Sequence, residues 1–111
     1  MTRHFTNEYF QDNPMKKPKL TILHLNLHRE FFSKIAAGTK RIEYRSQTPH
    51  WKARLENRKY DVIKFRNGYF SKAPEMLVEF RGVRRYGKGK NGYYAIRLGK
   101  VLDLKRWNDA K

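Results

Sequence analysis

The 111-residue chain contains no cysteine, and this absence excludes disulfide bonds and thiolate metal sites. Long hydrophobic runs are missing too: there is no stretch of about 18 apolar residues and no clear basic amphipathic helix, so we expect no membrane element. The first residues lack the apolar core of a signal peptide. Together these absences predict a cytoplasmic protein without a disulfide-linked partner.

Acidic residues are scarce: 10 Asp and Glu stand against 26 Lys and Arg, a formal charge of +16. Residues 1–18 hold three basic and two acidic residues, so nearly all of the excess lies beyond them. Residues 81–100 hold seven basic residues and no acidic one. Because each Lys or Arg that meets a phosphate releases condensed counterions, this balance favours a polyanionic partner. Solubility alone does not require such a one-sided surface.

The length suits a single domain. The stretch "NPMKKPKL", residues 13–20, has two prolines and three lysines, which is typical of an extended segment. We therefore predict a flexible arm over residues 1–18 and one domain over residues 19–111.

Hydrophobic periodicity predicts the order strand, helix, strand, helix and then three or more strands. The expected segments are residues 20–27, 28–38, 40–45, 48–57, 60–70, 75–86 and 93–104. Gly38 suits a left-handed helix cap, Thr48 can cap the second helix, and Gly82 marks a bend or bulge. The predicted fold class is α+β, with a mixed or antiparallel sheet curled into a small β-barrel and two helices covering its openings.

The segment "GTKRIEYR", residues 38–45, is the first candidate site. Glu43 and Arg45 are two apart and emerge on the same face of a strand, while Lys40 reaches them from the preceding turn. A carboxylate between two cations can hold them in place or act as a base toward a ligand. The alternative is a solvated charge ladder that contributes little to stability.

Two basic and aromatic segments are candidates for nucleic-acid binding: "FRNGYF", residues 65–70, and "RGVRRYGKGKNGYY", residues 81–94. Aromatic rings can stack on bases while Arg and Lys contact phosphates. The alternatives are a hairpin whose Tyr69 and Phe70 pack into the core, with Asn67 building the turn, and a solvated basic hairpin. The predicted contacts are Arg41, Lys52, Arg66, Asn67, Tyr69, Arg81, Arg84, Arg85, Tyr86, Lys88 and Lys90.

The histidines do not form a metal-binding pattern. His24 and His28 straddle a strand end and a helix start, so a zinc site is not expected without cysteine nearby. His24 could instead line a cavity beside Asn26. The sequence shows no pair of histidines of the kind that ribonucleases often use for acid–base catalysis.

The stretch "LHLNLHREFFSKIAAGTKRIEYR" resembles the opening of an ASCH domain, the activating signal cointegrator homology group. "GTKRIEYR" fits the family's G-x-K-x-x-E-x-R signature at Gly38, Lys40, Glu43 and Arg45, and "YDVIKFRNGY" and "YYAIRLGKVL" fit its later strands. The resemblance covers the chain from about residue 20 to the end. It implies a PUA-like β-barrel with a cleft rimmed by the signature residues.

The resemblance also implies a choice among functions. Family members are associated with RNA binding, with ribonuclease activity, and with hydrolysis of N4-acetylcytidine by a Lys, a Thr three residues later and a distant Glu. In this chain Glu43 occupies the position of that Thr, which weakens the amidohydrolase interpretation; Glu79 could supply the acid–base group there.

The first expectation is therefore a domain that binds RNA, single-stranded or containing modified bases, with Lys40, Glu43 and Arg45 around one nucleotide. The alternatives are a ribonuclease acting on single-stranded RNA and a nucleoside amidohydrolase, both using these three residues. No cofactor is expected, except for a divalent ion if the chain is a ribonuclease. The sequence does not indicate an oligomeric state.

Overall fold

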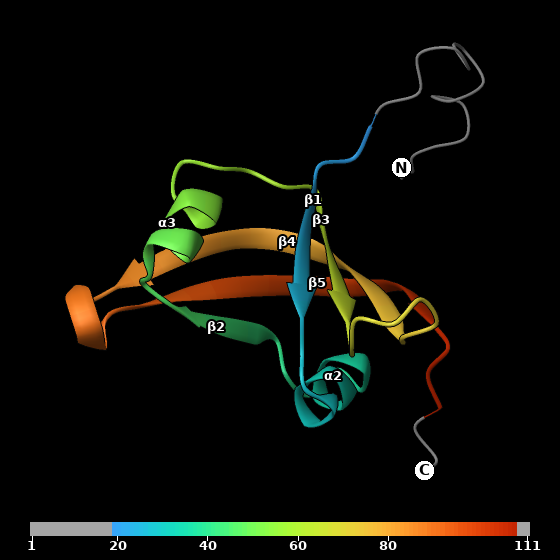
Figure 1. Ribbon diagram of the computed structural model, residues 1–111. Coiled ribbons are helices and arrows are strands. Elements are labelled where there is room, and N and C mark those ends of the chain that lie inside the picture. Colours follow the sequence, from blue (N-terminus) through green and yellow to red (C-terminus); the bar gives the residue numbers. More distant parts are fainter. Residues whose placement is uncertain (1–18, 109–111) are drawn as a thin grey trace, which may run out of the picture.

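The computed structural model describes residues 19–108; the predicted arm, residues 1–18, lies outside the described residues. The described chain contains five strands, two α-helices and one short 3-10 helix (Figure 1). In chain order these are β1 (Ile22–Asn26), α2 (Arg29–Ala36), β2 (Ile42–Ser46), α3 (Pro49–Leu55), β3 (Val62–Arg66), β4 (Glu75–Tyr86), η2 (Gly89–Asn91) and β5 (Tyr93–Lys105). The order of strands and helices predicted from periodicity is confirmed.

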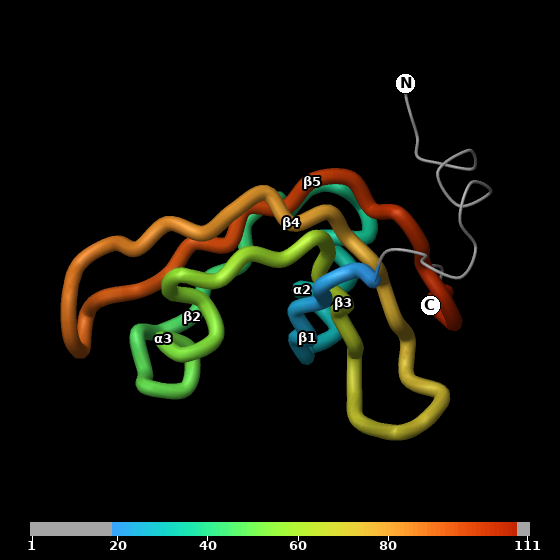
Figure 2. The backbone as a smooth tube through the Cα atoms, turned by 90° about the horizontal axis from the view of Figure 1, so that it is seen from above, coloured from blue at the N-terminus to red at the C-terminus, as the bar shows by residue number. Residues whose placement is uncertain are grey.

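The strands form one mixed sheet in the order β1-β3-β4-β5-β2. β1 runs parallel to β3, and the remaining neighbours are antiparallel. The long β4–β5 ribbon arches over the other elements, and β1, α2 and α3 lie on the inner side of the arch (Figure 2). β1 and β2 remain as edge strands, so the sheet is a curled half-barrel and the expected closure into a full barrel is not observed.

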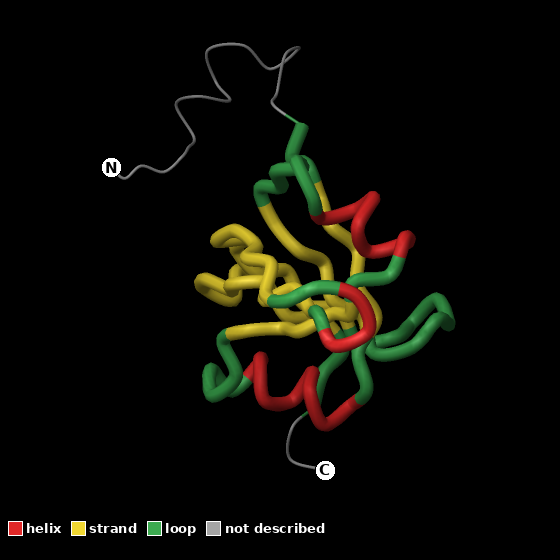
Figure 3. Tube along the Cα trace, turned by 90° about the vertical axis from the view of Figure 1, so that its left-hand side faces the viewer, coloured by secondary structure: helices red, strands yellow, loops and turns green. Residues whose placement is uncertain are grey.

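Local sequence signals define the ends of the helices as expected. Gly38 follows α2 with φ 83°, a left-handed conformation that glycine adopts at low cost. The Thr48 hydroxyl accepts a hydrogen bond from the Trp51 amide at 3.2 Å, and Pro49 occupies the first turn of α3. Figure 3 shows the result: α3 lies above the strands and α2 below them.

The core fills the inside of the curled sheet. Alternate residues of β1 and β5 point into it, and Phe32 and Ile35 of α2 cover one end. Phe31, the residue before Phe32 on α2, is exposed. Gly82 lies at φ 109° in a stretch where the β4–β5 register shifts, so the predicted bend or bulge in this strand is confirmed as an irregularity of the pairing.

The helices of the described chain are all too short and too polar to span a lipid bilayer. The loop that contains Asn67 is longer than a two-residue hairpin turn, because β3 ends at Arg66 and β4 begins at Glu75. The basic loop between β4 and β5 contains the short helix η2.

A hydrogen bond between Tyr94 and Glu56 ties β5 to the end of α3. The buried Tyr94 hydroxyl donates to the Glu56 carboxylate at 2.7 Å, and Arg85 donates to the same oxygen at 3.2 Å. The Tyr94 hydroxyl, followed by the charges of Arg85 and Lys52, lowers the pKa of Glu56 from its ordinary value of 4.5. Burial, followed by the Glu56 hydrogen bond, raises the pKa of Tyr94 above 10.0.

These two shifts predict loss of stability at both ends of the pH range. The stabilisation from Glu56 is complete above pH 4.5 and disappears as the pH falls through the lowered pKa of the folded state. The stabilisation from Tyr94 is complete below pH 10.0 and disappears as the pH rises through its raised pKa. Urea denaturation at a series of pH values should show both losses. Tyr94→Phe should lower the unfolding free energy at neutral pH and flatten both losses, whereas Tyr93→Phe, at an exposed position, should leave the profile unchanged.

Candidate functional site

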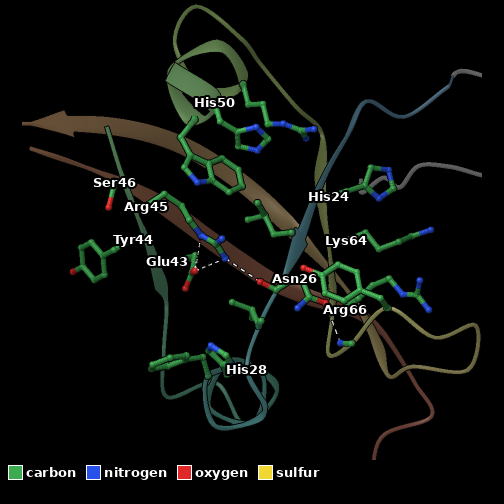
Figure 4. A pocket seen from close by; sticks show the side chains of 17 residues that line it. His24, Asn26, His28, Glu43, Tyr44, Arg45, Ser46, His50, Lys64 and Arg66 are labelled. Atoms are coloured by element: carbon green, nitrogen blue, oxygen red, sulfur yellow. Dashed lines mark hydrogen bonds and ion pairs between the residues drawn. The ribbon is translucent and has the colours of Figure 1, made fainter. Parts of the chain in front are cut away.

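A pocket of about 850 Å³ lies where the two open edges of the sheet approach each other. Figure 4 shows its side chains in two groups on either side of β1: Glu43, Arg45 and His50 on the β2 side, and His24, Lys64 and Arg66 on the β3 side. The complete lining is His24, Leu25, Asn26, Leu27, His28, Phe31, Glu43, Tyr44, Arg45, Ser46, His50, Trp51, Arg54, Lys64, Arg66, Gly68 and Tyr69. The predicted place of His24 and Asn26 beside a cavity is confirmed.

Glu43 is the only charged side chain that is buried in residues 19–108, at 6% exposure. In β2 the usual polarity is reversed, since Ile42 and Tyr44 face solvent while Glu43 points inward. The alternative interpretation, in which Glu43 belongs to a solvated row of surface charges, is therefore wrong. A buried carboxylate requires partners, because burying an unpaired charge costs several kcal/mol.

Arg45 is the main partner of Glu43. Its Nε and Nη2 lie 2.9 and 2.7 Å from Glu43 Oε2. The same guanidinium donates to the Asn26 carbonyl at 3.1 Å, so one side chain of the β2 edge reaches the β1 edge (Figure 4). The Trp51 ring covers the guanidinium, with its centroid 4.9 Å from Cζ. Arg45 therefore connects the two sheet edges, and Glu43 orients it.

Lys40 is the second cation beside Glu43, with its Nζ 3.5 Å from Oε1. The ammonium lies 5.4 Å from the Phe31 ring centroid and 5.5 Å from that of Tyr44. Lys40 lines a neighbouring hollow of about 450 Å³ rather than the main pocket. Phe31 and Tyr44 line both hollows, so Lys40 stands at the rim between them.

Periodicity and spacing missed several residues of the pocket. His28, His50 and Trp51 line it together with His24. They come from separate elements, since His24 belongs to β1, His28 directly precedes α2, and His50 and Trp51 belong to α3. In the described structure the three imidazoles make no hydrogen bond to protein; His28 and His50 have only ring contacts with Phe31 and Trp51. The histidines that the sequence does not pair are thus brought into one pocket by the fold.

The predicted contacts in residues 65–70 have different environments. Arg66 Nη2 donates to the carbonyls of Phe70 and Ser71, and its Nε lies 3.2 Å from Glu75 without hydrogen-bond geometry. The Asn67 side-chain amide donates to the Leu27 carbonyl at 2.9 Å, so it ties the loop after β3 to the end of β1. Tyr69 is 86% exposed at the pocket rim, and Phe70 is exposed as well, so their packing into the core is wrong.

The other predicted contacts lie outside the pocket. Arg84, Tyr86, Lys88 and Lys90 are exposed at the tip of the β4–β5 hairpin, and Arg85 nearby pairs with Glu56. Arg81 is exposed and pairs with Glu79. Lys52 is exposed on α3, and Arg41 lines the hollow beside Lys40.

Glu79, the possible acid–base group, is not part of the pocket lining. The Lys100 amide and the Arg81 guanidinium donate to it, both at 2.9 Å, and in that order they lower its pKa from 4.5. Among residues 19–108 no group of three or more His, Asp or Glu side chains is arranged to hold a metal ion.

Comparisons with protein-family models, with curated proteins and with solved structures found no match to this chain. The site combines one buried carboxylate, flanking cations, three imidazoles and four aromatic rings around a hollow of a size that suits a small ligand.

Proposed function

We propose that this chain is a PUA-like domain of the ASCH type that binds single-stranded RNA and accepts one nucleotide in the pocket between β1 and β2. The observation that carries the proposal is the buried Glu43 between Lys40 and Arg45 beside a pocket of about 850 Å³. These are the residues of the G-x-K-x-x-E-x-R resemblance. Pockets of 300–1,000 Å³ are typical for small ligands.

The lining supplies the contacts that a nucleotide needs. Trp51, Phe31 and the exposed Tyr69 offer rings for base stacking. Lys64 and Arg54 make no ion pair in the described structure and can meet a phosphate. Among residues 19–108 the partner of Glu43 Oε1 is Lys40, whose Nζ lies 3.5 Å away, and the oxygen can also accept a hydrogen bond from a base amino group or a ribose hydroxyl.

The test is binding of the four 5′-nucleoside monophosphates by calorimetry and of a labelled RNA octamer by fluorescence anisotropy. We expect binding of at least one nucleotide and, in Lys64→Gln, affinity about tenfold lower, equivalent to ~1.4 kcal/mol. Lys59→Gln is the matched control, because Lys59 is exposed and does not line the pocket. Equal affinity in both variants, or no nucleotide binding at all, contradicts the proposal.

A ribonuclease is the second candidate, because three imidazoles line the pocket. One imidazole would take the proton of a ribose 2′-hydroxyl as its oxygen attacks the adjacent phosphorus, and another would give a proton to the departing 5′-oxygen, leaving a 2′,3′-cyclic phosphate. The binding mixtures, run on a denaturing gel with and without EDTA, separate the candidates: intact RNA supports binding alone. The amidohydrolase alternative receives less support, since Lys40 lies at the rim and is paired with Glu43.

A further inference from the structure

A row of three tyrosines crosses the outer face of the sheet on strands β2, β5 and β4. The rings of Tyr44 and Tyr93 meet edge to face with centroids 5.6 Å apart, and those of Tyr93 and Tyr86 stack at 5.2 Å. All three remain exposed, by 53%, 40% and 40% for Tyr44, Tyr93 and Tyr86. Exposed rings in this number need an explanation, since each leaves apolar area in water.

Strand register brings these rings together. Tyr86 is the direct cross-strand partner of Tyr93, while Tyr44 opposes Ala95, two residues further along β5 on the same face. The tip is held by Gln47, whose amide donates to the carbonyls of Tyr86, Gly87 and Tyr93 at 2.9–3.1 Å. The row is therefore a preformed surface rather than a set of loose side chains.

Within residues 19–108, the tyrosine row lies among cations, and Glu79, further along β4, is already paired with Arg81. Arg84 and Arg97 are exposed on the same face, with the Arg84 guanidinium 5.9 Å from the Tyr86 ring, and Lys88 and Lys90 follow at the hairpin tip. Residues 81–100 contain no acidic residue, and Glu43 of β2 points to the other face. Exposed rings with interleaved positive charge are the surface that stacks bases and neutralises phosphates.

The row is continuous with the pocket. Tyr44 lines the pocket and also begins the row, and Figure 4 shows its ring on the side of β2 away from Glu43 and Arg45. Lys40 stands between Phe31 and Tyr44 at this edge, 5.4 and 5.5 Å from the two rings. A chain leaving the pocket over the β2 edge thus meets a cation first and the tyrosines next.

We propose that the outer face is a second RNA subsite: a single strand with one nucleotide in the pocket passes Lys40 and stacks its next two or three bases on Tyr44, Tyr93 and Tyr86. This inference rests on the proposed function and adds that the substrate is a short oligonucleotide. Three neighbouring strands about 4.8 Å apart span about 10 Å, which accommodates about three bases at ~3.4 Å each. A second copy of the chain is a poorer occupant, because this face would oppose its own positive charge.

The experiment measures affinity against RNA length, from a mononucleotide to an octamer, for the full chain and for Tyr93→Ala. For the full chain we expect affinity to rise over the first three or four nucleotides and then level off. Because stacking on one ring contributes about 1–3 kcal/mol, Tyr93→Ala should bind the octamer roughly 5- to 150-fold more weakly. Its affinity for a mononucleotide should not change. Tyr93→Phe keeps the ring and should bind the octamer like the unaltered chain, and thermal melting of each variant checks its folding.

Several outcomes would overturn the inference and leave the proposed function intact. They are nucleotide binding without dependence on length, octamer binding insensitive to Tyr93→Ala, or equal affinity for a duplex, whose paired bases cannot stack on the row. A dimer in sedimentation that Tyr93→Ala dissociates would assign the row to self-association instead. If the chain binds neither the mononucleotide nor the octamer, the proposed function itself is overturned, and this inference with it.

Discussion

Arg45→Met is expected to lower the free energy of unfolding by about 3 kcal/mol, since removing one partner of a buried ion pair leaves the other charge uncompensated. Glu43 is 6% exposed, and Arg45 supplies its two shortest contacts, at 2.7 and 2.9 Å. Lys40, 3.5 Å from the other oxygen, would remain as a weaker partner. We therefore expect the loss of unfolding free energy to lie at the low end of what removal of one partner of a buried ion pair usually causes. Urea denaturation of both proteins at neutral pH measures the difference.

The chain contains a matched control in the pair of Glu79 and Arg81. This pair has the same spacing of two residues on one strand and a contact of 2.9 Å, but the Arg81 side chain is 58% exposed. Arg81→Met should therefore lower the unfolding free energy by less than about 1 kcal/mol. Equal costs for Arg45→Met and Arg81→Met would contradict the buried role assigned to Glu43.

A double variant identifies the source of the effect. If the cost of Arg45→Met comes from an uncompensated carboxylate, Glu43→Gln in the same chain should restore part of the lost stability, because the neutral amide costs less to bury. If the two costs simply add, the carboxylate does not depend on Arg45, and the geometry of the site needs another explanation.

The affinity for a single-stranded RNA octamer should fall about 100-fold between 50 and 200 mM salt. About five phosphate contacts give a slope of roughly −3.5 in log affinity against log salt for a single strand. The exposed cations of the hairpin tip and the pocket rim can supply this number. Anisotropy titrations at four salt concentrations measure the slope, and an uncharged nucleoside should show almost no dependence.

Two double variants of equal net charge show whether the hairpin cations contact RNA phosphates at defined positions. Lys88→Gln with Lys90→Gln should reduce the slope by roughly 1.4, since two phosphate contacts disappear. Lys59→Gln with Lys105→Gln removes the same charge elsewhere on the surface and should leave the slope nearly unchanged. The same reduction in both double variants would mean that net charge, and not the hairpin, attracts the RNA.

Positions governed by local chemistry were predictable from the sequence. Gly38 ends α2 in a left-handed conformation, Thr48 and Pro49 begin α3, and Gly82 marks the irregular stretch of β4. Each of these effects depends on residues within a few positions of one another. For the same reason, the placement of Lys40, Glu43 and Arg45 within one group followed from their spacing.

The composition of the pocket was not predictable in this way. His24, His50 and Trp51 line one pocket because the sheet curls until its two edge strands face each other, and no spacing along the chain encodes that approach. Conversely, Glu79 and Asn67 carry groups that suit catalysis or base recognition but already have partners in the protein. The Lys100 amide and Arg81 donate to the Glu79 carboxylate, and the Asn67 amide donates to the Leu27 carbonyl. Such pairings depend on contacts between residues distant in the sequence.

The sequence by itself determined the order of strands and helices, their local caps and the strongly positive charge, because these depend on neighbouring residues and on composition. Only the tertiary structure decided which face of β2 turns inward. A period of two separates Glu43 from Tyr44 but does not say which of them is buried. Pairing with β5 on a curled sheet places the carboxylate inside and the tyrosine outside, and so creates both the pocket and the tyrosine row.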